Sequence, residues 1–135
     1  MASQGVAAIA KYQLVIFSAQ PQDLTILTAV AAAAGQVGFI AAAKEADAIA
    51  AALAAETPSF DGRLVLIDTR LPDAAADRVL TCLRGASVSG RMIALVPYSA
   101  QADEESVRLA GYDGLLATPL SPSRVHRLLT AGIEA

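Results

Sequence analysis

Five short apolar runs alternate with segments of helical character, and this alternation restricts the fold more than any other feature of the sequence. The runs predict five strands: Leu14–Phe17, Val37–Ala41, Leu64–Ile67, Met92–Val96 and Leu115–Ala117. The segments between and after them predict five helices: Pro21–Ala34, Glu45–Glu56, Ala74–Arg84, Asp103–Ala110 and a last helix that begins after Ser121. Strands that are apolar throughout are typical of parallel sheets covered by helices on both faces. The sequence therefore predicts an α/β fold with a doubly wound, five-stranded parallel sheet.

The length of 135 residues fits a single domain with a sizeable core. Residues 1–11 are small and irregular, which is typical of a linker or a cloning remnant. We predict that the domain spans residues 12–132 and that residues 133–135 form a C-terminal tail.

Composition excludes several classes of protein. The net charge of −3 and the pI near 5.0 argue against a nucleic-acid-binding protein, which normally carries a basic face. The apolar run 24–40 is interrupted by threonine, glycine and glutamine, so we expect no membrane span there. No basic residue precedes Lys11, so a signal-peptide start is not indicated and the cytoplasm is the expected location.

A single cysteine and a single histidine exclude an internal disulfide and a Cys/His zinc site. Cys82 lies among apolar residues at helical spacing, and is interpreted as a packed thiol. His126 neighbours Arg127 on the last helix and is interpreted as a surface residue. Neither residue is a catalytic candidate.

The third apolar run leads directly into a carboxylate, Asp68, which a short loop with Leu71 and Pro72 follows. In open α/β sheets, functional sites lie at the carboxyl ends of the strands. An aspartate there can accept a phosphoryl group, bind a metal ion, or be a retained residue without a reaction. The partners of Asp68 elsewhere in the sequence decide between these three interpretations.

Other enzyme classes lack their motifs. The loop after the first strand, residues 18–21, has neither glycine nor lysine, which argues against a P-loop, a dinucleotide site and a flavodoxin-type phosphate loop. The chain also has no nucleophile elbow that would support a Ser/His/Asp assembly.

Three motifs, in order and at suitable spacing, resemble the receiver domains of bacterial response regulators. They are Asp68 with the following Leu71-Pro72, the segment Ala110–Gly114, and Thr118-Pro119-Leu120. The resemblance covers about residues 12–132 and implies a (βα)5 receiver, or flavodoxin-like, fold and a role in two-component signalling.

The chain departs from the receiver pattern at every position that supports Asp68. In the family, an acidic pair after the first strand holds Mg²⁺, and here Ser18 and Ala19 take its place. The family's phosphate-contacting Thr or Ser falls on Val96, its lysine on Thr118, and its switch aromatic on Leu115. The chain therefore resembles a degenerate pseudo-receiver, as in hybrid histidine kinases.

These departures remove the charges that phosphoryl transfer requires. The transfer depends on positioning and on neutralisation by metal ions and cations, and Mg²⁺ is usually held by one or two carboxylates. We expect Asp68 to be the only carboxylate of the site, with no lysine in place of the missing cation. The sequence thus predicts a non-catalytic regulatory domain with a vestigial Asp68, no metal and no cofactor. The alternative is a phosphorylatable receiver that uses Asp68 as its acceptor.

The remaining functional candidates follow the face around the fourth helix, the fifth strand and the fifth helix, which often carries domain contacts in the family. The candidates are Arg108, Tyr112, Leu120, Pro122, Arg124 and Arg127, with Tyr98 in the preceding loop. One hypothesis is a docking surface for a kinase core or a neighbouring receiver domain. A second is a site for cyclic di-GMP, in which arginines bind phosphate or guanine edges and the apolar residues form a shelf. The third is a solvated arginine face without a ligand.

Overall fold

The computed structural model of the chain describes residues 14–36, 38–55, 64–85, 91–97 and 104–134. The strands are β1 (Leu14–Phe17), β2 (Gly38–Ala41), β3 (Leu64–Asp68), β4 (Arg91–Pro97) and β5 (Gly114–Thr118). The helices are α2 (Pro21–Ala33), α3 (Ala43–Ala55), the short 3₁₀ turn η2 (Pro72–Ala74), α4 (Ala75–Gly85), α5 (Glu104–Ala110) and α6 (Pro122–Glu134). All five predicted strands and all five predicted helices are present.

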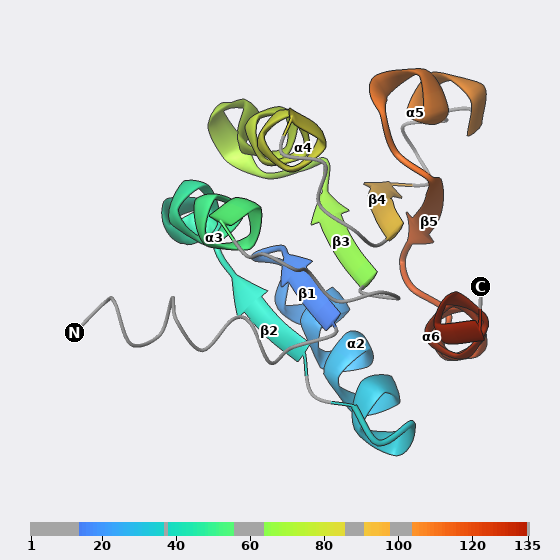
Figure 1. Ribbon diagram of the computed structural model, residues 1–135. Coiled ribbons are helices and arrows are strands. Elements are labelled where there is room, and N and C mark those ends of the chain that lie inside the picture. The colour runs from blue at the N-terminus through green and yellow to red at the C-terminus, as the bar shows by residue number, and fades with distance from the viewer. Residues whose placement is uncertain (1–13, 37, 56–63, 86–90, 98–103, 135) are drawn as a thin grey trace.

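The five strands form one parallel sheet in the order β2-β1-β3-β4-β5. Helices α3, α4 and α5 cover one face of the sheet, and α2 and α6 cover the other (Figure 1). The predicted doubly wound sheet is confirmed. Strand β3 is central, so its carboxyl end lies between those of β1 and β4.

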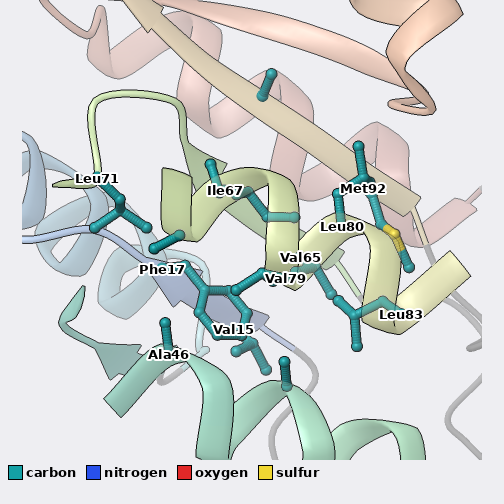
Figure 2. Close-up of a cluster of buried hydrophobic side chains, with 14 of the residues drawn as sticks. Val15, Phe17, Ala46, Val65, Ile67, Leu71, Val79, Leu80, Leu83 and Met92 are labelled. Atoms are coloured by element: carbon teal, nitrogen blue, oxygen red, sulfur yellow. The ribbon is translucent and has the colours of Figure 1, made fainter. Parts of the chain in front are cut away.

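The sheet separates two apolar cores because successive side chains of a strand point to opposite faces. Figure 2 shows the larger core, in which side chains from the strands pack against α3 and α4. Its labelled members include Val15, Phe17, Val65, Ile67, Val79, Leu83 and Met92. The smaller core joins the strands to α2 and α6 through Leu27, Ala31, Val125 and Leu129.

Helix α2 ends where the sequence indicates. Gly35 has a φ of +77°, and the N–H of Gln36 donates to the carbonyl of Ala31 at 2.8 Å. This is the left-handed helix end that glycine allows without a Cβ clash. The chain then turns into β2, which divides the apolar run 24–40 between a helix and a strand. Among the described residues, no helix has the length and the hydropathy to cross a bilayer.

Several observed boundaries differ from the predicted ones. Helix α3 begins at Ala43, two residues before the predicted Glu45, and strands β3, β4 and β5 each extend one residue beyond the predicted carboxyl end. Helix α6 continues to Glu134, so residues 133 and 134 belong to the helix and not to a tail. The third predicted helix begins one residue later than expected, because Asp73 and Ala74 have positive φ values of 59° and 57° and precede α4 as a tight turn. The predicted linker 1–11 lies outside the described residues.

Candidate functional site

Asp68 lies at the carboxyl end of the central strand and is only 1% exposed. Its Oδ1 accepts hydrogen bonds from the backbone N–H and the Nε of Arg70, each at 2.9 Å. Its Oδ2 accepts from Nη2 of Arg70 at 2.9 Å and from the hydroxyl of Ser18 at 2.8 Å. A carboxylate has about four acceptor positions. Donors from the chain itself therefore fill the acceptor capacity of Asp68.

The loop after β3 directs the Arg70 side chain back onto Asp68. The N–H and the hydroxyl of Thr69 both donate to the carbonyl of Leu95, at 3.0 and 2.9 Å, which fixes the loop to β4. The N–H of Leu71 donates to the carbonyl of Asp68 at 3.2 Å and closes the turn. Buried Leu71 anchors the far side of the loop. With both ends held, the bidentate guanidinium contact is made within a rigid turn.

A second carboxylate, Asp23, reaches the same site from the first turn of α2. It is buried, and its Oδ2 pairs with Nη2 of Arg70, the same nitrogen that contacts Asp68. The hydrogen bond with Asp68, followed by the one with Asp23, raises the pKa of Arg70 above its ordinary value, although burial opposes this. One sequence prediction is therefore wrong, because Asp68 is not the only carboxylate of the site. The sequence offers no lysine as the cation of the site, and the structure instead places an arginine, Arg70, there.

A cavity of about 600 Å³ opens at this edge of the sheet. Its lining comes from the loops after β1, β3 and β5: Gln20, Pro21, Gln22, Asp23, Arg70, Thr118 and Pro119. The side chain of Arg70 is 28% exposed, whereas that of Asp68 is 1% exposed. The guanidinium therefore stands between the cavity and the carboxylate that a phosphoryl donor would have to reach.

The Mg²⁺ ion of ordinary receiver domains does not fit these residues. Both oxygens of Asp68 are engaged by the guanidinium, and the position of the acidic pair offers a buried hydroxyl at Ser18 and an exposed methyl group at Ala19. Mg²⁺ requires oxygen ligands in near-octahedral geometry. Within the described part of the chain, no group of three or more His, Cys, Asp or Glu side chains could hold a metal ion.

The other positions that depart from the receiver pattern carry no charge to the site. Val96 is buried in β4, and Leu115 is half-buried in β5. Thr118 is buried and lines the cavity, and its peptide bond to Pro119 is cis. Of the five substituted positions, only Ser18 donates a hydrogen bond to Asp68.

The predicted ligand-binding residues do not all reach one surface. Arg108 is exposed on α5, and Pro122, Arg124 and Arg127 are exposed at the start and along the length of α6. Leu120, in contrast, is buried in the smaller core.

Tyr112 is also interior, since it is 6% exposed and belongs to the larger core. Burial, reinforced by the negative charge of Asp77, raises its pKa to about 12, and its hydroxyl has no hydrogen-bond partner within the described residues. The predicted apolar shelf of Leu120, Pro122 and Tyr112 is therefore wrong for two of its three members. Tyr98 lies outside the described residues.

A shallow apolar groove of about 510 Å³ lies between α2 and α6. It is lined by Thr25, Ile26, Ala29, Val30, Ala33, Pro122, Ser123 and His126. Helix α2 is apolar around most of its circumference, so it carries apolar side chains on its outer side as well as its inner side. His126 is exposed at the groove, and Cys82 is half-buried against the larger core, as the sequence indicates.

The chain has the fold of a flavodoxin-like α/β domain, with the strand order β2-β1-β3-β4-β5 and helices α2 to α6 on the two faces of the sheet. Asp68 ends the central strand, at the carboxyl edge where such sheets carry their sites. The chain matches no family model and no curated protein. Solved structures, however, place its fold among response-regulator receiver domains.

One similar structure is the receiver domain of the Francisella response regulator 1452, with a TM-score of 0.70, 16% identity, and coverage of 90% of this chain and 95% of that chain. Another is the REC domain of AraT, a response regulator from Geobacillus stearothermophilus, with a TM-score of 0.69, 14% identity, and coverage of 90% and 92%. A third is the receiver domain of the sensor histidine kinase PA1611 from Pseudomonas aeruginosa, with a TM-score of 0.64, 23% identity, and coverage of 92% and 99%. The PA1611 structure has a magnesium ion coordinated in its active-site cleft.

Proposed function

We propose that this chain is a receiver-fold domain of a bacterial, cytoplasmic two-component signalling protein that does not accept a phosphoryl group and regulates by docking. The observation that carries the proposal is the saturation of Asp68 by Arg70 and Ser18. The domain is a regulatory module and not an enzyme. A hybrid histidine kinase is the parent protein that best suits such a module.

Aspartyl phosphorylation requires an acceptor oxygen that faces the donor and cations that neutralise the transferred group. Here the Asp68 oxygens face Arg70, and the guanidinium is paired with two carboxylates instead of being directed at a donor. The charges of Asp23, Asp68 and Arg70 sum to −1, so the site repels an anionic donor. Attack by Asp68 would first require the ion pair to break inside a largely buried site.

Incubation of the chain with acetyl phosphate and Mg²⁺, followed by intact-mass spectrometry, tests the proposal. We expect no phosphoryl adduct on a timescale on which a receiver domain with a complete acidic pair is fully labelled. An adduct in the wild type that is lost in Asp68→Asn would contradict the proposal. That result would establish the alternative, a phosphorylatable receiver with Asp68 as acceptor.

The surface that supports docking lies at the edge of the sheet formed by β5. Helices α5 and α6 flank this strand on opposite faces (Figure 1), and they carry the exposed residues Arg108, Arg124 and Arg127. Leu109, which follows Arg108, is 81% exposed and adds an apolar side chain to this surface. Arginine is enriched in protein interfaces relative to the rest of the protein surface. The partner is therefore expected to present acidic groups, on a kinase core or on a neighbouring receiver domain.

Charge reversal tests the docking surface. In a pull-down with the kinase core of the parent protein, Arg124→Glu combined with Arg127→Glu is expected to weaken capture at least tenfold. Lys44→Glu is the matched control, because Lys44 is exposed on α3 at the opposite, β2 edge of the sheet. Equal loss in the control, or no loss in the double variant, would contradict docking through this face.

A second candidate function is the binding of cyclic di-GMP on α6. Two exposed arginines three residues apart, Arg124 and Arg127, favour it, because neighbouring guanidinium groups match phosphates and guanine edges. Since Leu120 and Tyr112 are buried, such a site would have Pro122 as its apolar contact. Calorimetric titration with cyclic di-GMP should give heat that Arg124→Ala abolishes. A titration of the wild type without heat removes this candidate.

A further inference from the structure

One nitrogen joins the two buried carboxylates of the site. Nη2 of Arg70 contacts Oδ2 of Asp68 at 2.9 Å and also pairs with Oδ2 of Asp23. The neighbouring Nε contacts Oδ1 of Asp68 at 2.9 Å. Both carboxylates are anchored on separate elements, β3 and the first turn of α2, so the guanidinium bridges two parts of the fold that are far apart in the sequence.

We propose that Arg70 is a tethered cation that occupies the place of a divalent ion and makes the charge and geometry of this pocket independent of Mg²⁺. The inference rests on the proposed function, because it explains how a receiver fold is held in one state without metal or phosphate. The positive charge is permanent, since a guanidinium does not deprotonate in proteins and these carboxylates raise its pKa further.

The tether favours Arg70 over a dissolved ion. The guanidinium is attached two residues from Asp68 and lies in a turn fixed to β4, so its local concentration at the carboxylates is high. Mg²⁺ would have to lose part of its strongly held hydration shell and displace three charge-assisted hydrogen bonds. The wild-type pocket therefore excludes the ion by occupancy, because the guanidinium takes the place that an ion would need and already neutralises one of the two carboxylate charges.

The same geometry predicts what removal of Arg70 would expose. Two buried carboxylates and the hydroxyl of Ser18 would then face one site beside a water-accessible cavity. These are oxygen ligands, which Mg²⁺ and Mn²⁺ prefer. Because the Oδ2 atoms of Asp23 and Asp68 contact the same nitrogen, an ion in the place of that nitrogen would be within reach of both oxygens.

The test uses Mn²⁺ and ¹⁵N-labelled protein, because a bound paramagnetic ion broadens nearby amide signals. In the wild type, no selective broadening of Ser18, Asp68 or Arg70 is expected. In Arg70→Met, substoichiometric Mn²⁺ should broaden Ser18 and Asp68, and Mg²⁺ in about tenfold excess over its Kd should raise Tm by about 6 °C. Arg70→Met combined with Asp68→Asn is the matched control and should lose both responses. Arg70→Gln serves as the second variant if the methionine variant does not fold.

Selective broadening in the wild type would overturn the inference, as would the absence of a response in folded variants that lack Arg70. The inference and the proposed function fail separately. A wild type that binds Mn²⁺ at Asp68 but is not labelled by acetyl phosphate contradicts only the inference that Arg70 occupies the place of a divalent ion. A wild type that acetyl phosphate labels contradicts the proposed function.

Discussion

Replacing Arg70 with methionine is the perturbation whose cost the structure defines best. The change removes three charge-assisted hydrogen bonds, two to Asp68 and one to Asp23, while the backbone N–H of residue 70 still donates to Asp68. Removing one partner of a buried ion pair costs about 3–5 kcal/mol, because the remaining charges stay buried and unpaired. The lower end applies here, since Arg70 is 28% exposed and the adjacent cavity admits water. We therefore expect a loss of about 3 kcal/mol and, at about 4 °C per kcal/mol, a fall in Tm of about 12 °C.

Urea denaturation of the wild type, Arg70→Met, Asp68→Asn and the double variant measures this loss as a double-mutant cycle. The double variant should be more stable than Arg70→Met by about 1–2 kcal/mol, because a neutral amide at position 68 no longer needs a cation. A loss below about 1 kcal/mol in Arg70→Met would mean that the ion pair is solvated and not buried, since a surface pair costs that little. Strict additivity of the two substitutions would lead to the same conclusion.

Three further predictions concern Ser18 beside the site, and Tyr112 and Asp113 elsewhere in the fold. Ser18→Ala should destabilise the fold by about 1–2 kcal/mol in urea, because it removes a hydroxyl donor from the buried carboxylate of Asp68. Tyr112→Phe should raise stability by about 1 kcal/mol, because the buried hydroxyl has no partner within the described residues. Since the pKa of Tyr112 is raised from 10.0 to about 12, the folded wild type keeps its proton where the unfolded chain has lost it. Stability should therefore fall as pH rises from about 10 to 12, and denaturation curves of Tyr112→Phe should lack that component. Asp113→Ala should cost more than Arg84→Ala in thermal melts. Both changes break the half-exposed ion pair, which contributes below about 1 kcal/mol, and each also removes one bond to the backbone. Asp113 accepts the part-buried N–H of Met92 in β4 at 2.7 Å, whereas Arg84 donates to the carbonyl of Gly111 in an exposed contact, so only Asp113→Ala leaves a part-buried donor unpaired; equal losses would contradict this.

The strands could be predicted from sequence because a strand that is buried on both faces is an uninterrupted run of apolar residues. Leu14–Phe17 is buried throughout and has the predicted bounds, and the bounds of Leu64–Asp68 differ by one residue. The end of α2 was equally predictable, since Gly35 provides the left-handed residue that the helix end requires. Periodicity and turn chemistry are local properties, so the sequence alone suffices for them.

The ion-pair site could not be predicted in full because it joins residues that are 47 positions apart, Asp23 and Arg70. Two local signals were nevertheless present. Arg70 follows Asp68 by two residues in a short loop, and Asp23 lies in the first turn of the helix that follows β1. Strands β1 and β3 are neighbours in the sheet, which brings these loops together. Without that pairing, the sequence indicates missing metal ligands but not the group that replaces the ion.

Tyr112 was assigned to the wrong side for a related reason. The loop before β5 has neither helical nor strand periodicity, so the sequence does not show which way the side chains of this loop point. Hydrogen bonds to other parts of the fold hold the loop in place. The N–H and the carboxylate of Asp113 both bond to the backbone of Met92, each at 2.7 Å, and Arg84 donates to the carbonyl of Gly111 at 2.8 Å. This clamp accompanies the packing of Tyr112 into the larger core, away from the exposed arginines of α6.

The partner of Asp68 is Arg70, and not a metal ion or a phosphoryl group. A crystal structure of the chain grown with Mg²⁺ and beryllofluoride, the stable mimic of an aspartyl phosphate, is the decisive measurement. We expect a bidentate Arg70–Asp68 pair, with Asp23 on the same guanidinium nitrogen and no beryllium bonded to Asp68. Beryllofluoride on an Asp68 oxygen, with Arg70 displaced into solvent, would show that Arg70 does not hold this place.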